Sequence, residues 1–175
     1  GKLVINDSAE TKGKVELAGA GTHAGGTELL SGTLETGAAG ALGTGPLALS
    51  GGTLELGTVD ATAGDMTVTN TVTLKVRLGM EADLSGSGSL APASVTFLND
   101  ATNTLQVVLD LNGIDTPLLR YPLLLSTSLP ADATNRMTLT FINGGAGLLS
   151  TASVSLEKRS DGIYALFSGV NPPKN

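Results

Sequence analysis

The sequence contains no cysteine and no tryptophan, and His23 is its only histidine. Without cysteine there is no disulfide framework, and one histidine cannot supply the ligand set of a zinc site. Charged residues make up only 15% of the chain and the net charge is −6, so no basic surface favours nucleic acid or anionic lipid. We therefore expect no metal, no cofactor and no nucleic-acid partner.

Long apolar runs are also absent. The longest, residues 117–125, is too short to span a bilayer and is interrupted by Arg120, so we expect no membrane insertion. No signal peptide precedes Gly1 and Lys2, which predicts a mature or trimmed product. Only three Phe and two Tyr stand against 24 Gly in 175 residues, so the core must be built from Leu, Val and Ala.

A short segment, Gly-Thr-Leu-Glu, occurs at positions 32–35 and again at 52–55, and Val-Thr-Leu-Lys follows at 72–75. A fixed step of about 20 residues indicates one structural unit laid down repeatedly, and it is too short for most two-helix repeats. The same step, to within one position, leads backwards from Leu34 to Val15 and forwards from Leu74 to Val95. The spacing predicts an all-β coil of short strands.

Strict alternation of apolar and polar residues in these segments predicts which side chains are inside. Leu34, Leu54 and Leu74 should stack about 4.8 Å apart in the core. The outer face should carry two ladders, Thr33/Thr53/Thr73 and Glu35/Glu55/Lys75. The predicted strands of this half are 15–17, 27–29, 32–35, 46–49, 52–56, 66–69 and 71–78.

The composition changes near Ser89 to Ser94, because 18 of the 24 Gly precede residue 91 and all five aromatic residues follow it. We therefore divide the chain into β-solenoid repeats at 1–93 and a β-rich C-terminal cap at 94–175, continuous with the repeats. In the second half, 105–111, 121–125, 137–142, 154–157 and 163–167 read as longer antiparallel strands. Asn112-Gly113 and Asp161-Gly162 are typical hairpin turns.

Residues 15–27 with 31–34, and residues 40–56, resemble the autotransporter-associated β-strand repeat, also called the passenger-associated transport repeat. The run Ala-Leu-Gly-Thr-Gly-Pro-Leu at 41–47 is the most specific part of the similarity. His23 stands where members of that family usually carry an aromatic residue.

This resemblance implies a right-handed parallel β-helix in a secreted or surface-displayed bacterial protein, with no catalytic residues to carry over. The chain has no room for the membrane barrel that ends an autotransporter. We therefore expect either a cleaved piece of a larger protein or a self-standing secreted subunit.

Parallel β-helices also host pectin-cleaving enzymes, so charged side chains on the outer face are a candidate site. Lys75 and Arg77 should share a face, with Glu55 one repeat away, and such groups could abstract a proton and stabilise charge. No further acidic residue is expected near Arg77. The favoured interpretation is a solvated face with a cross-repeat ion pair contributing roughly 0 to 1 kcal/mol.

Two polar patterns have simpler explanations than a binding site. Asp110 to Asp115 superficially resembles a calcium loop, but its donor spacing fails and no final Glu follows. The alternating Thr67, Thr69, Thr71 and Thr73 resemble an ice-binding array, which Glu35 and Glu55 interrupt in the neighbouring repeats.

His23 has no partner for a catalytic triad, so a surface or corner position is favoured. Tyr121, Tyr164 and Phe167 could stack on sugars, although aromatic residues at alternating strand positions usually belong to the core.

The sequence therefore predicts a non-enzymatic structural or surface-display module, located outside the bacterial cell, that serves as a stalk or a self-associating subunit. Leu3 to Ile5 is a candidate edge strand for pairing with a neighbouring chain. The alternatives are an adhesin or glycan-binding module, which requires an exposed aromatic pair, and then a polysaccharide-degrading enzyme.

Overall fold

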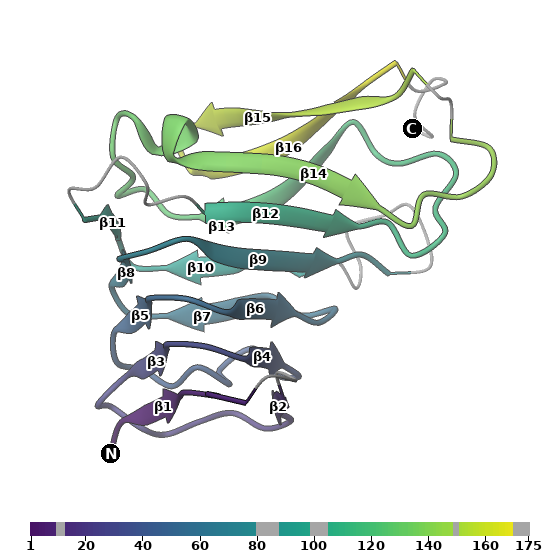
Figure 1. Cartoon of the computed structure of the whole chain (residues 1–175). Coiled ribbons are helices and arrows are strands. Elements are labelled where there is room, and N and C mark those ends of the chain that lie inside the picture. The colour runs from purple at the N-terminus through teal and green to yellow at the C-terminus, as the bar shows by residue number, and fades with distance from the viewer. Residues whose placement is uncertain (10–12, 80–87, 99–104, 149–150, 170–175) are drawn as a thin grey trace.

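The computed structural model describes residues 1–9, 13–79, 88–98, 105–148 and 151–169, and in these ranges the chain is all-β. Apart from strands, the described residues contain one short 3-10 helix, η1 (Ala133–Arg136). The strands belong to three sheets whose members lie one above another, with β1 and β2 at one end and β14, β15 and β16 at the other (Figure 1).

Except for β15 and β16, successive strands of the chain enter different sheets, so each sheet collects strands that are distant in the sequence. The six-stranded sheet has the order β14 (Met137–Ile142), β12 (Leu105–Asp110), β9 (Val72–Arg77), β6 (Thr53–Leu56), β4 (Thr33–Thr36) and β2 (Lys14–Leu17).

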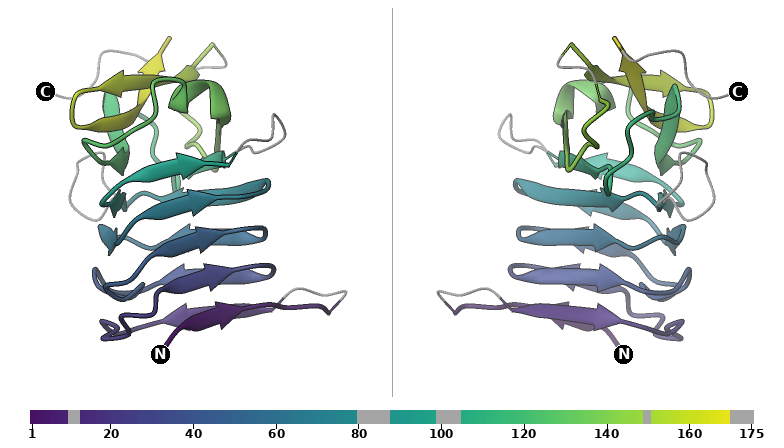
Figure 2. Two further views of the ribbon diagram at one scale, coloured as in Figure 1. Left: turned by 90° about the vertical axis from the view of Figure 1, so that its left-hand side faces the viewer. Right: turned by 90° about the vertical axis from the view of Figure 1, so that its right-hand side faces the viewer.

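Each of the two five-stranded sheets is named after one of its inner strands. The β5 sheet has the order β1 (Leu3–Ile5), β3 (Thr27–Leu29), β5 (Leu47–Leu49), β8 (Met66–Val68) and β11 (Val95–Phe97). The β10 sheet has the order β15 (Ser153–Arg159), β16 (Gly162–Ser168), β13 (Arg120–Leu125), β10 (Leu90–Pro92) and β7 (Ala61–Ala63). Two further views show how the strands follow one another around the body (Figure 2).

The predicted leucine column is confirmed. Leu34 pairs with Leu54 and Leu54 with Leu74 in parallel register, and all three side chains are fully buried. The column continues to Val15 at one end and to Val107 and Leu139 at the other. Alternation explains this placement, because every second residue of a strand points to the same face of its sheet.

Both predicted outer ladders are confirmed as well. Thr33, Thr53 and Thr73 are register partners on adjacent strands. Two residues further along the same strands, Glu35, Glu55 and Lys75 are register partners as well. Every strand predicted in the first half is present, with small differences at the strand ends.

The extension of the repeat step to Val95 is wrong. The register partner of Leu74 is Val107, which lies further along the chain, whereas Val95 pairs with Met66 in the β5 sheet. Two strands of the other sheets lie between β9 and β12, just as two lie between β6 and β9, so the longer step comes from the longer connections. These connections include residues 80–87 and 99–104, which lie outside the described part.

The predicted hairpin at Asn112-Gly113 is also wrong, although the local conformation is that of a tight turn. Both residues have positive φ, 50° and 85°, as type I′ turns require. The chain nevertheless turns a corner there, and β12 pairs in parallel with β9 and β14 instead of with the strand that follows it. The expectation of antiparallel pairing for 105–111 and 137–142 fails for the same reason.

Antiparallel pairing is confined, among the described strands, to β13, β15 and β16. The β15–β16 hairpin confirms the turn expected near Asp161, with Ser160 and Asp161 as the loop residues between Arg159 and Gly162. Aromatic side chains form the core of this end.

Tyr121 and Phe167 are buried edge to face with ring centroids 5.9 Å apart, and Phe141 lies 5.8 Å from Phe167. The aromatic residues therefore replace the leucine columns as the packing element of the C-terminal end.

Candidate functional site

Ionic contacts run across the outer face of the six-stranded sheet and form what we call the charged ladder: Lys14, Glu35, Glu55, Lys75 and Asp110. Lys14 contacts the carboxylates of both Glu35 and Glu55, at 3.4 Å from Nζ to Oε2 for Glu55. Lys75 Nζ lies 3.1 Å from Glu55 Oε1 and 3.7 Å from Asp110 Oδ2. In strand order, the adjacent carboxylates of Glu35 and Glu55 therefore lie between two lysines, and Asp110 follows Lys75.

The ladder forms because the parallel register brings residues far apart in sequence to neighbouring positions. Glu35, Glu55 and Lys75 occupy one register, and Asp110 is the register partner of Arg77 on the next strand. The expectation that no acidic residue lies near Arg77 is therefore wrong. Asp110 was missed because the step from β9 to β12 is much longer than the step between the earlier strands of this sheet.

Glu55 is held in its ionised form. Burial alone would raise the pKa of its carboxyl, but the hydrogen bond and charge of Lys75, with the charge of Lys14, outweigh burial and lower that pKa below the ordinary 4.5. A carboxylate tied to two cations is a poor general base, because its lone pairs and its charge are already engaged.

Asp110 is held in the same way. Burial would raise the pKa of its carboxyl, but the hydrogen bonds from Asn143 Nδ2 (3.0 Å) and the Asn112 backbone N–H (3.1 Å) lower it, as do the charges of Lys75 and Arg77. The resulting pKa lies below the ordinary 3.8. Neither Glu55 nor Asp110 therefore carries a proton to donate near neutral pH.

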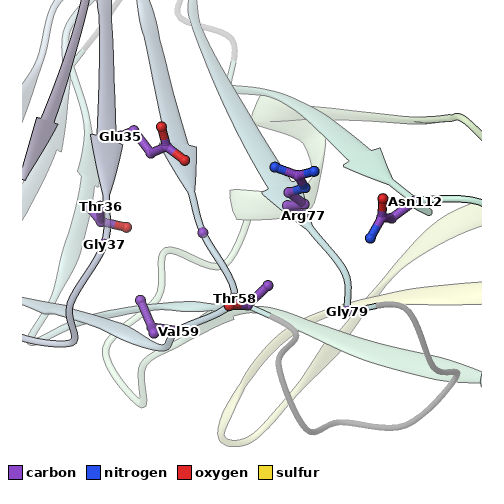
Figure 3. A pocket seen from close by; sticks show the side chains of 9 residues that line it. Glu35, Thr36, Gly37, Thr58, Val59, Arg77, Gly79 and Asn112 are labelled. Carbon is purple, nitrogen blue, oxygen red and sulfur yellow. The ribbon is translucent and has the colours of Figure 1, made fainter. Parts of the chain in front are cut away.

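A shallow hollow of about 440 Å³ lies beside the ladder, where the six-stranded sheet meets the following corner (Figure 3). Arg77 and Glu35 are its charged lining residues, and the exposed Arg77 makes none of the ion pairs found among the described residues. Thr36 also lines it, and its hydroxyl is buried without a hydrogen-bond partner in the described structure. The remaining lining residues are Gly37, Gly57, Thr58, Val59, Gly79 and Asn112.

This arrangement does not assemble a catalytic constellation. Lys75 and Arg77 share the outer face as predicted, but the carboxylates nearest to Lys75 are ion-paired with it. A typical glycoside hydrolase needs one carboxyl kept protonated and a second one free. Here the effect of burial on the pKa is outweighed by the two lysines at Glu55, and by hydrogen bonds and nearby cations at Asp110. The contacts brace neighbouring strands instead.

In the segment that resembles a calcium loop, the two aspartates accept hydrogen bonds from different partners. Asp110 accepts the hydrogen bonds of Asn143 and Asn112, while Asp115 Oδ1 accepts one from the Gly147 backbone N–H at 2.9 Å. Among the described residues, no group of three or more His, Asp and Glu side chains could hold a metal ion.

His23 lies at a corner and is half-buried. Its Nε2 and Thr27 Oγ1 are 2.9 Å apart, and the Thr27 hydroxyl donates in turn to the Leu42 carbonyl. The imidazole thus belongs to a chain of hydrogen bonds that joins two successive corners.

The aromatic residues considered for sugar stacking are separated by burial. Tyr121 and Phe167 are core residues, while Tyr164 is half-buried at the surface, where its hydroxyl donates to Asp161 Oδ2 at 2.9 Å. The Arg159 guanidinium lies 5.9 Å from the centre of the Tyr164 ring. None of the five aromatic residues, all of which are described, is fully exposed.

No family model, curated protein or solved structure matches the chain. The resemblance of residues 15–56 to the autotransporter-associated repeat therefore remains a prediction from the sequence. In the part of the chain that the structure describes, no helix is long and apolar enough to cross a membrane.

The charged ladder predicts a loss of stability in acid. The pKa values of Glu55 and Asp110 are lowered by folding, so the unfolded chain binds protons first as the pH falls. Their contribution is present in full above the unfolded values of 4.5 and 3.8 and disappears as the pH drops through the lower folded values. We expect the ladder to contribute on the order of 1 kcal/mol at pH 7.

Urea unfolding of the native chain and of Lys75→Met at several pH values checks this expectation. The variant keeps the length of the side chain and removes its charge. Its deficit in the free energy of unfolding should be greatest at pH 7 and should shrink as the pH falls below the unfolded pKa values of 4.5 and 3.8. A deficit that is the same at pH 7 and pH 3 would mean that Lys75 acts through packing alone.

Proposed function

We propose that the chain is a non-enzymatic structural module of an exported bacterial protein, built as a right-handed parallel β-helix with a β-rich C-terminal cap. The observation that carries this proposal is the uninterrupted column from Val15 through Leu34, Leu54 and Leu74 to Val107. Such a column makes each strand depend on its two neighbours, which is the construction of a solenoid. Parallel strands joined by crossovers are right-handed in nearly all proteins, which supports that hand here.

The placement of charge supports a structural role. Lys14 and Lys75 are engaged by the carboxylates of neighbouring strands, so the outer face is braced and not primed for proton transfer. The predicted resemblance adds the location, since the family that residues 15–56 resemble is associated with export and display at the bacterial surface. We propose an extracellular or cell-surface setting on that basis.

The arrangement of the ends supports a role as stalk or as self-associating subunit. At the C-terminal end, β15 and β16 add antiparallel strands and the aromatic cluster of Tyr121, Phe141 and Phe167 fills the core. A closing layer of this kind blocks continued stacking in that direction. The other end carries no such layer among the described residues.

A glycan-binding module is the second candidate, and one observation favours it. Tyr164 lies on the surface beside Arg159, where an aromatic face and a cation could contact a sugar. Its half-buried ring and the absence of a second exposed aromatic residue among the described ones make this the weaker proposal.

Surface display, glycan binding and polysaccharide cleavage can be measured on the same protein. With an export signal and an outer-membrane anchor fused to it, the chain should reach the bacterial surface folded and resistant to protease. The purified chain should bind no glycan on an array and leave polygalacturonate intact. Glycan binding that survives high salt and disappears in Tyr164→Ala would replace the structural proposal with the second candidate. Polygalacturonate cleavage lost in Lys75→Ala or Arg77→Ala would replace it with an enzyme.

A further inference from the structure

The N-terminal end of the sheets presents open strand edges and an uncovered core. β1 and β2 are the last strands of their sheets, and no described strand pairs with their outer edges. Val15 is 41% exposed, although Leu34, Leu54 and Leu74 in the same column are fully buried. Hollows border this end, one of them lined by Val4, Ile5 and Val15. An edge with both free backbone groups and apolar side chains favours pairing with another strand.

The backbone of β2 shows which residues are free to pair. The Thr33 N–H donates to the Gly13 carbonyl at 3.0 Å, and the Gly37 N–H donates to the Leu17 carbonyl at 2.9 Å. Successive residues of a strand direct their backbone groups to opposite edges. Because the backbone groups of residues 13 and 17 face β4, those of residue 15 face β4 too. The N–H and C=O groups of Lys14 and Glu16 therefore point to the open edge.

We propose that a second copy of this chain occupies that edge, with β2 pairing antiparallel to β2 of the other copy about a twofold axis through Val15. This inference rests on the self-associating form of the proposed function and names its surface. Because the twofold operation makes the same patch meet itself, β2 must be complementary to its own sequence read backwards.

Side-chain direction and charge select one register. Val15 faces inward, whereas Lys14 and Glu16 face outward. The two copies must therefore pair odd-numbered residues with odd-numbered ones, since only then do inward-facing side chains lie opposite each other. Pairing Lys14 or Glu16 with its own copy sets like charges opposite each other, which is destabilising. The remaining register pairs Val15 with Val15 and each Lys14 with Glu16 of the other copy.

This register also uses all of the free backbone groups. Lys14 and Glu16 of the other copy form a hydrogen-bonded pair, and the symmetry repeats it, so both residues exchange N–H and C=O contacts with the partner. Val15 then sits in the central non-hydrogen-bonded pair, where its side chain closes the exposed end of the leucine column against its copy. At the opposite end β14 is also the last strand of its sheet, but β15 and β16 add antiparallel strands and an aromatic core there, so the two ends are not equivalent.

Single-cysteine variants test the register, because the native chain contains no cysteine. Opposed residues of a non-hydrogen-bonded pair lie about 4.5 Å apart at Cα, within the range of a disulfide, whereas diagonal neighbours lie about 7–8 Å apart. Val15→Cys should therefore form an intermolecular disulfide under mild oxidation. Lys14→Cys and Glu16→Cys should not, nor should Val4→Cys, which controls for random collision of an exposed position at the same end.

Proline variants test the edge without relying on a covalent bond. Glu16→Pro removes an N–H that faces outward, which edge strands tolerate, so the chain should become monomeric and stay folded. Its melting temperature should equal that of the native chain diluted below its dimer dissociation constant. Val15→Pro removes an N–H directed at β4 and should lower the melting temperature itself. Glu16→Lys should raise the dimer dissociation constant about tenfold, since both opposite-charge pairs become like-charge pairs.

Sedimentation equilibrium on the native chain should show a dimer. A folded monomer at high concentration, fastest cross-linking through residue 14 or 16, or equal cross-linking of Val4→Cys and Val15→Cys would each overturn the proposal and leave the edge to another segment or protein. None of these results bears on surface display, glycan binding or polysaccharide cleavage. The dimer can therefore fail while the stalk form of the proposed function stands.

Discussion

Replacing Leu54 with alanine should lower the free energy of unfolding by about 3 kcal/mol, the usual cost of emptying a fully buried leucine site. Leu54 lies in the middle of the column, between Leu34 and Leu74, and has no exposed surface. Neighbouring strands are held by backbone ladders on both sides, so the site cannot collapse to fill the space. Loss of contact would affect the strands above and below together.

Two matched variants separate burial from strand position in a urea denaturation series. Thr53→Ala changes the adjacent, outward-facing residue and should shift the free energy of unfolding by less than about 0.5 kcal/mol. Val15→Ala changes the exposed end of the same column and should cost clearly less than Leu54→Ala. An effect of Leu54→Ala no larger than that of Thr53→Ala would show that the column is not a continuous core.

Gly52→Ala should be about as damaging, at roughly 2–4 kcal/mol, for two separate reasons. Gly52 has a φ of 75°, in the left-handed region that a Cβ disfavours. A Cβ at this position would also lie 2.5 Å from the carbonyl oxygen of Gly32 on the preceding corner. Because that contact is with backbone, the two corners would have to separate.

Two other glycines isolate these causes. Gly113 has a φ of 85° but nothing within 4 Å of an added Cβ, so Gly113→Ala should show only the conformational cost, about 1 kcal/mol. At Gly19 the φ is not positive and no atom is near, so Gly19→Ala should be close to neutral. Thermal melts of the three variants should rank them in this order. Gly52→Ala no worse than Gly113→Ala would argue against close stacking of the corners.

The strands of the first half were predictable because the alternation of apolar and polar residues coincides there with a regular repeat step. β7 was missed, since Ala61 to Ala63 offers no large apolar residue, and Ala61 is buried only because β10 lies beside it. Asn112 and Gly113 show the opposite limit. Their turn conformation is a local property and could be predicted. Whether such a turn connects the two strands of a hairpin or forms a corner between sheets depends on which strand pairs with the one before it.

The candidate site likewise contains contacts that the sequence predicted and contacts that it did not. The contact between Glu55 and Lys75 follows from the regular repeat step and was predicted. The contact between Lys75 and Asp110 was not predicted, because longer connections change the step and the pairing of β9 with β12 has no local signal. The open edge of β2 needed the structure too, since only the direction of its hydrogen bonds shows which residues are free.

By itself the sequence determined most strands, the side of each that is buried and the corners that need glycine, because side-chain alternation and backbone conformation are properties of neighbouring residues. Only the tertiary structure decided the partners of β12 and β14, the place of Asp110 in the charged ladder and the end of the column that stays uncovered. Those features depend on which distant strands meet, and the free energy of that choice resides in contacts between segments, which no short stretch of the chain contains.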